Sequence, residues 1–128
     1  MIQTYKDALA YIYDFHNSKG YDLDKMRNVA KNLGNPQNSY KVIHITGTNG
    51  KGSTCNMCFS VLKKAEKKVG IFTSPHLLDI RERFKTDEGM ISKDDLLHIV
   101  QKIEPYAKEL SYFEKCTLIA FEYFRQQQ

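Results

Sequence analysis

The residues best suited to chemistry lie in one short segment, 42–54, which reads Val-Ile-His-Ile-Thr-Gly-Thr-Asn-Gly-Lys-Gly-Ser-Thr. An apolar strand, a glycine-rich turn and a hydroxyl-rich helix start are typical of a phosphate site, because a helix N-terminus offers unpaired N–H groups and a positive dipole end. Gly47, Gly50 and Gly52 let the backbone approach phosphate oxygens without an intervening Cβ. Lys51 adds a mobile positive charge near the β- and γ-phosphates. We therefore predict a nucleotide site, with ATP as its ligand.

The segment departs from the general P-loop pattern at two positions. That pattern has a glycine five positions before Gly50, where Ile45 stands, and Ser or Thr directly after Lys51, where Gly52 stands. A plain glycine-rich turn is the alternative interpretation, but the order of strand, glycines, lysine and hydroxyls favours a phosphate loop. The predicted ATP-binding residues are Gly47, Thr48, Asn49, Gly50, Lys51, Gly52 and Ser53. Lys51 is the predicted catalytic residue, and the hydroxyl of Ser53 or Thr54 is a candidate Mg²⁺ ligand.

These departures match a particular family. Thr-Gly-Thr-Asn-Gly-Lys-Gly-Ser, residues 46–53, resembles the phosphate loop of folylpolyglutamate synthases and dihydrofolate synthases, relatives of the Mur ligases. The turn 73–77, Thr-Ser-Pro-His-Leu, and the Glu82-Arg83 pair that follows it resemble the omega loop after the family's second strand. The resemblance implies that Ser74 is a Mg²⁺ ligand. On chemistry alone, Ser-Pro is commonly just a turn.

Two further segments resemble the parts of these synthases that contact the pterin end of the substrate. The folate-binding residues implied in this way are Ser111, Tyr112, Phe113 and Glu114, with Tyr21 and Asp22 from the looser match at 20–23. A serine that caps a helix above packed aromatic residues is the structural alternative for 111–114, and both roles are compatible.

The resemblance implies an ATP-dependent ligase that joins L-glutamate to the carboxylate of a folate, dihydropteroate or tetrahydrofolate, through an acyl phosphate. ATP and Mg²⁺ are the implied cofactors, and the parent protein is expected to be a monomer. The alternatives are another P-loop enzyme, such as a small-molecule kinase, and a non-catalytic nucleotide-binding module. A kinase would share the loop at 46–53 but would not need the turn at 73–77.

The composition of the chain limits the classes of partner that we expect it to bind. The 128 residues carry 19 basic and 15 acidic side chains, a net charge of +4 that is too small and dispersed to indicate nucleic-acid binding. The lysines at 63, 64, 67 and 68 are expected on the solvated end of a helix. No apolar run approaches membrane-spanning length, and the N-terminal residues do not resemble a signal peptide. Three cysteines suit the reducing cytoplasm, where we expect the protein, and Cys55 and Cys58 are predicted to be small buried residues.

The spacing of apolar residues predicts the helices and strands that must position these residues. Helices are predicted at about 5–13, 22–33, 51–69, 92–103 and 113–125, strands at 42–46 and 69–73, and a hairpin at 84–91. Two strands with an intervening helix predict a right-handed βαβ unit in a parallel sheet. The predicted fold is therefore α/β, a P-loop NTPase-like parallel sheet with flanking helices. Because two or three strands cannot complete such a sheet, residues 1–128 are expected to be the N-terminal part of the ATP-binding domain of a longer protein.

Overall fold

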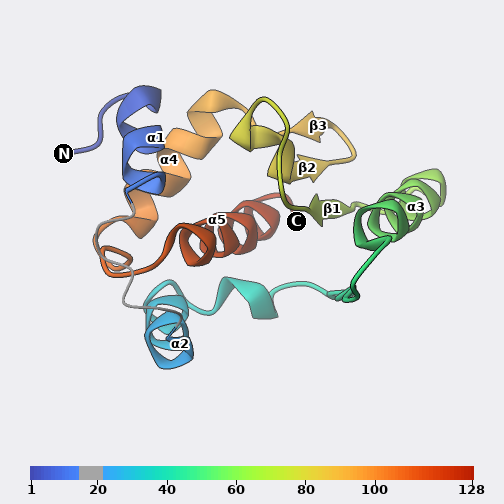
Figure 1. Cartoon of the computed structure of the whole chain (residues 1–128), viewed down its shortest axis with the longest axis horizontal. Helices are drawn as coiled ribbons and strands as arrows, with labels where there is room; N and C mark the ends of the chain where they lie inside the picture. Colours follow the sequence, from blue (N-terminus) through green and yellow to red (C-terminus); the bar gives the residue numbers. More distant parts are fainter. Residues whose placement is uncertain (15–21) are drawn as a thin grey trace.

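The computed structural model describes residues 1–14 and 22–128. Within them, five α-helices accompany a small sheet that lies between α3 and the other helices (Figure 1). In chain order the elements are α1 (Tyr5–Ile12), α2 (Leu23–Asn32), the 3₁₀ turn η1 (Pro36–Asn38), α3 (Lys51–Lys64), β1 (Gly70–Phe72), the 3₁₀ turn η2 (Ile80–Arg83), β2 (Phe84–Thr86), β3 (Gly89–Met90), α4 (Lys93–Ile103) and α5 (Tyr112–Gln126).

Side-chain caps explain where the helices begin. The carboxylate of Asp22 accepts hydrogen bonds from the first backbone N–H groups of α2, and the hydroxyls of Ser92 and Ser111 do the same for α4 and α5. These starts confirm the predicted helices. The helix after the phosphate loop ends at Lys64, earlier than predicted, because Glu66 adopts a left-handed φ of 56° and closes the last turn.

The sheet differs from the prediction. Its three strands are antiparallel in the order β1-β2-β3, with Phe72 opposite Phe84 and Thr86 opposite Gly89. The hairpin at 84–91 is confirmed, whereas the predicted parallel sheet and its βαβ unit are wrong for this structure. The predicted strand at 42–46 does not form, because this segment has no ladder partner among the described residues, although β1 is an edge strand of the sheet.

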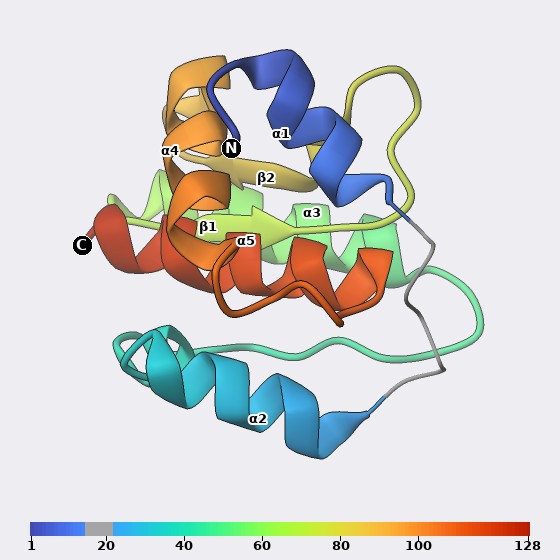
Figure 2. The same cartoon turned by 90° about the vertical axis from the view of Figure 1, so that its left-hand side faces the viewer.

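The core lies along α5, which crosses the middle of the molecule (Figure 2). α2 packs below it, and α1, α4 and the sheet lie above it in this view. The most deeply buried side chains come mainly from α4, α5 and the hairpin; they include Phe84, Ile91, Leu96, Ile99, Ile103, Leu118 and Ile119. These elements share one hydrophobic core, to which α5 contributes along its length.

α3 lies at the periphery of the molecule (Figure 1). None of its residues, all of them described, is fully buried, and Cys55 and Cys58 are only half-buried. The prediction that these two cysteines are buried is therefore wrong, because α3 contacts mainly β1 and the strand expected beside it does not form. In the described part of the chain, every helix falls short of the length or apolarity that crossing a membrane requires.

Candidate functional site

The phosphate loop leads directly into α3. Gly50 is the N-cap of the helix and has a left-handed φ of 75°, and Gly47 has a φ of 151°. Residues other than glycine rarely adopt these two backbone conformations. The ammonium group of Lys51 donates to the carbonyl of Gly47 at 2.6 Å and lies 3.4 Å from that of Thr48. Among the described residues no side chain caps α3, so the first N–H groups of the helix are available to an anion. The local geometry is thus compatible with the predicted phosphate site.

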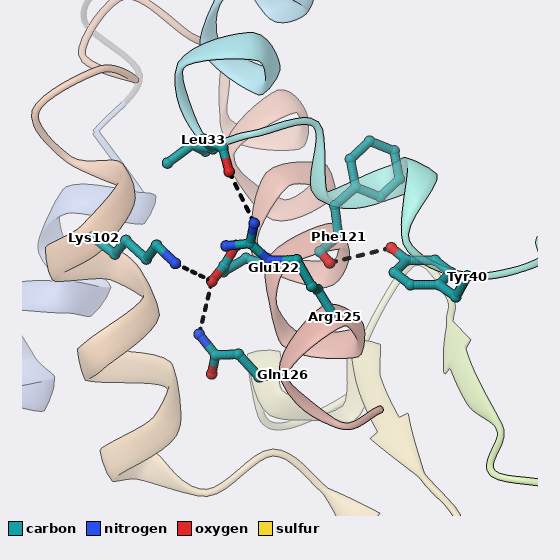
Figure 3. Close-up of polar contacts among 7 residues, drawn as sticks. All are labelled: Leu33, Tyr40, Lys102, Phe121, Glu122, Arg125 and Gln126. Atoms are coloured by element: carbon teal, nitrogen blue, oxygen red, sulfur yellow. Dashed lines mark hydrogen bonds and ion pairs between the residues drawn. The ribbon is translucent and has the colours of Figure 1, made fainter.

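The chain that leads into this loop is fastened to α5. The guanidinium of Arg125 donates to the carbonyl of Leu33 at 3.0 Å, and the hydroxyl of Tyr40 donates to the carbonyl of Phe121 at 3.2 Å (Figure 3). Burial of the Tyr40 ring beside Glu122 raises the pKa of its hydroxyl to about 12, so it remains a donor at neutral pH. These two bonds fix the segment 33–40 on either side of η1.

Glu122 holds the guanidinium of Arg125 in the position from which it donates to Leu33. Its fully buried carboxylate accepts hydrogen bonds from Lys102 at 2.6 Å, from Arg125 at 2.5 Å and from Gln126 at 2.9 Å (Figure 3). Burial by itself raises the pKa of this carboxyl group, but the three hydrogen bonds and the charge of Lys102 together bring the pKa below its ordinary value. The carboxylate therefore stays ionised and links α4 and α5 to the end of α2.

The turn that carries Ser74 is organised by Glu82. Its carboxylate accepts hydrogen bonds from the backbone N–H groups of Leu77, Leu78 and Asp79, at 2.9, 2.9 and 2.8 Å. These bonds lower the pKa of Glu82 to about 2. Ser74 is exposed, and its bond to the following proline is cis. Leu77 and Leu78 are 89% and 95% exposed, so the carboxylate rather than apolar packing holds this turn.

The predicted folate-binding residue Asp22 and the predicted folate-binding segment 111–114 meet at the start of α5. The carboxylate of Glu114 accepts hydrogen bonds from the backbone N–H of Ser111 at 2.8 Å and from that of Asp22 at 3.3 Å. Phe113 is 41% exposed and stacks on Phe72 of β1, with ring centroids 6.0 Å apart. Tyr21 lies outside the described residues.

A cluster of side chains joins the predicted folate-binding residues 111–114, here called the folate element, to the turn that carries Ser74. Tyr112 stacks on Tyr13 at the end of α1 and lies under the guanidinium of Arg83, which in turn donates to His76. Burial raises the pKa of Tyr112. Sequence reasoning missed Tyr13, because nothing in the local pattern of α1 indicates a partner 63 residues further along the chain.

The three predicted segments lie on the same side of the molecule, with α3 set apart from the start of α5 along the long axis (Figure 1). Figure 2 shows that the N-termini of α3 and α5 and the chain that leaves the C-terminal end of β1 all lie on this side. The predicted metal ligands, Ser53 in the first turn of α3 and Ser74 after β1, are both exposed there. Serine hydroxyls suit Mg²⁺, which takes oxygen ligands and completes its shell with substrate phosphates and water. Among residues 1–14 and 22–128, no cluster of three His, Cys, Asp or Glu side chains could hold a metal by itself.

No protein-family model matches the chain, but individual proteins do. The folylpolyglutamate synthase of Lacticaseibacillus casei is 34% identical over 135 residues, covering 98% of this chain and 32% of that protein. The dihydrofolate synthetase of Saccharomyces cerevisiae is 38% identical over 106 residues, covering 80% of this chain and 25% of that protein. The chain therefore spans about a quarter to a third of the length of these relatives.

Solved structures agree with the sequence matches. A folylpolyglutamate synthase complex with AMPPCP and folate has a TM-score of 0.89 at 34% identity, covering 98% of this chain and 33% of that one. The bifunctional folylpolyglutamate synthase/dihydrofolate synthase of Yersinia pestis, complexed with AMPPNP and a Mn ion, has a TM-score of 0.87 at 31% identity, covering 97% and 31%. The chain is thus a homologue of the N-terminal part of the folylpolyglutamate and dihydrofolate synthases.

Proposed function

We propose that the protein is an ATP-dependent carboxylate–amine ligase that adds L-glutamate to the carboxylate of a folate. Residues 1–128 would form the N-terminal part of its ATP-binding P-loop domain. The observation that carries the proposal is that the predicted phosphate loop, the Ser74 turn and the 111–114 element all lie on the same side of the fold (Figure 2). Relatives solved with a nucleotide analogue, with folate and with a Mn ion support the same set of ligands. We place the enzyme in the cytoplasm, as a monomer.

A carboxylate is a poor electrophile, and the reaction therefore needs activation. An oxygen of the folate carboxylate attacks the γ-phosphorus of ATP, the bond to the β–γ bridging oxygen breaks, and ADP leaves. The neutral amine of L-glutamate then attacks the acyl phosphate carbon, and the resulting tetrahedral intermediate expels inorganic phosphate, forms the amide and releases the amine proton. Mg²⁺, when bound, neutralises charge on the phosphate oxygens.

The residues of this chain contribute binding and electrostatics. The free N–H groups at the start of α3 receive phosphate oxygens, and Lys51, which already lies over the loop, follows the charge that grows as the γ-phosphoryl group is transferred. Ser53 and Ser74 would supply oxygen ligands to Mg²⁺. Asp22, Ser111, Tyr112, Phe113 and Glu114, with Tyr21, would form the wall of the folate site. Positioning and charge stabilisation, rather than covalent catalysis, are thus the proposed roles.

The test is product formation by the full-length protein that carries this segment. With ATP, Mg²⁺, L-glutamate and either tetrahydrofolate or dihydropteroate, we expect a glutamylated product with ADP and phosphate in equal amounts. Lys51→Ala should lower the rate on the order of 10²- to 10³-fold, since it removes one preorganised charge contact. Lys64→Ala, an exposed lysine in the last turn of the same helix, is the matched control and should retain the rate.

The rival functions give different products. A small-molecule kinase would release a phosphorylated compound without requiring L-glutamate, and a nucleotide-binding module would bind ATP without any product. Equal rates for Lys51→Ala and Lys64→Ala would remove Lys51 from the site.

A further inference from the structure

Four side chains from four parts of the chain form a closed ring beside the Ser74 turn. Arg83 Nε donates to His76 Nδ1 at 2.8 Å, and the Arg83 guanidinium lies 5.4 Å from the centre of the Tyr112 ring. Tyr112 stacks on Tyr13 with centroids 5.3 Å apart and planes inclined by 16°. The hydroxyl of Tyr13 lies 3.3 Å from His76 Nε2, which closes the ring.

The hydrogen bonds define the state of the imidazole. The arginine Nε–H can only donate, so His76 Nδ1 must accept and a neutral ring carries its proton on Nε2. That N–H then points to the oxygen of Tyr13. The ring of contacts therefore selects one tautomer and one orientation of His76, a residue two positions after Ser74.

Arg83 is the buried member of this arrangement. Arg83 is only 6% exposed, although it is charged, and its backbone carbonyl also accepts a hydrogen bond from the N–H of Thr73 at 3.2 Å. Arginine presents a planar fork that stacks on a ring and donates sideways at once, which lysine cannot do. Arg83 is thus held by both the Ser74 turn and α5.

We propose that Tyr13, His76 and Arg83 are positioning residues that fix the Ser74 turn against the folate element at Tyr112. This inference rests on the proposed function and adds residues that are not among the predicted ligands of ATP or metal. These four contacts fix the position of the Ser74 hydroxyl relative to the predicted folate-binding residues 111–114. Loss of the contacts would therefore misplace both the predicted Mg²⁺ ligand and the folate-binding residues.

The test compares two arginines of the same 3₁₀ turn. Arg83→Lys keeps the charge but loses the fork, and it should lower kcat/KM on the order of 10- to 100-fold, because small misplacements of reacting groups carry costs of that size. We expect both the KM for folate and the Mg²⁺ concentration for half-maximal rate to rise. Arg81→Lys, which disturbs the ion pair with Asp79 and the hydrogen bond with Tyr5 but no contact of the ring, should leave both values unchanged. A merely structural role for Arg83 would lower the rate through the folded fraction alone and would leave both values in place.

A double-mutant cycle and a spectroscopic measurement complete the test. Tyr13→Phe keeps the stacking on Tyr112 but removes the hydroxyl. Its effect on kcat/KM should be smaller in the Arg83→Lys background than in the unaltered protein, since both changes break the same closed set of contacts. Imidazole ¹⁵N spectra of the unaltered protein should show His76 with its proton on Nε2, whether or not ligation occurs. Fully additive effects, or a proton on Nδ1, would overturn the positioning role. The absence of ligation with the expected His76 spectrum would instead refute the proposed function.

Discussion

Replacement of Glu122 by glutamine tests how much the ion network around this buried carboxylate contributes to the stability of the fold. Glutamine has nearly the same shape, but it replaces one acceptor oxygen by an amide N–H₂ that faces a cation. Lys102 and Arg125 both donate to the carboxylate, at 2.6 and 2.5 Å, so at least one charge-assisted bond is lost outright. The protein should unfold more readily as a result.

The size of the effect follows from the exposure of the partners. A hydrogen bond to a charged group contributes about 1.5–3 kcal/mol, and removal of one partner from a buried pair costs more. The side chains of Lys102 and Arg125 are 45% and 27% exposed, so water compensates part of the loss. We therefore expect about 2 kcal/mol of destabilisation, which for a 128-residue chain corresponds to a decrease in Tm of about 7 °C.

The measurement is thermal and urea unfolding followed by circular dichroism, with Glu104→Gln as the matched control. Glu104 pairs with Lys108 at 3.6 Å on the surface of the molecule, and such a pair contributes less than about 0.5 kcal/mol. The folded-state pKa of Glu122 lies below its ordinary value of 4.5, so its contribution is present above that pH and is lost as the pH falls. The difference between Glu122→Gln and the unaltered protein should therefore shrink in acid. A Tm for Glu122→Gln equal to that of Glu104→Gln, or a difference that grows in acid, would refute the reasoning.

Two further changes test the site and the packing. Ser74→Ala in the full-length protein should raise the Mg²⁺ concentration needed for half-maximal ligation, because one ligand is lost while the others remain; an unmoved Mg²⁺ dependence would make residues 73–77 a structural turn only. Gly70→Ala should destabilise the fold by about 1–3 kcal/mol, since its Cβ would lie 2.5 Å from two ring carbons of Phe124, whereas Gly52→Ala, with no atom within 4 Å, should be neutral or stabilising in urea unfolding.

The elements that sequence reasoning predicted well are those with local causes. Asp22, Ser92 and Ser111 each accept hydrogen bonds from N–H groups two or three residues later, so a short window contains the whole explanation of a helix start. The hairpin at 84–91 belongs to the same class, because its two strands are joined by a turn of two residues. Local chemistry therefore sufficed for these elements.

The parts that were missed depend on distant partners. The segment 42–46 has the composition of a strand, yet a strand requires a neighbour, and composition does not say which neighbour is taken. The contact between Tyr13 and His76, 63 residues apart, and the ion pair of Lys102 with the buried Glu122 likewise have no local signature. The motifs at 46–53 and 73–77 indicated where the candidate site lies, but not what holds it in place.

The exposure of α3 has a consequence for motion. A helix of 14 residues is marginal in water without packing, and Gly52 weakens it further. Its amide protons should therefore exchange with solvent through local opening, at a free energy well below that of α5, and the phosphate loop must share that opening because Lys51 begins the helix. Met57 and Val61, each 67% exposed, offer an apolar surface to any element that packs there. Such packing would strengthen the proposed nucleotide binding by reducing the conformational entropy that the loop loses, without a single contact to the nucleotide.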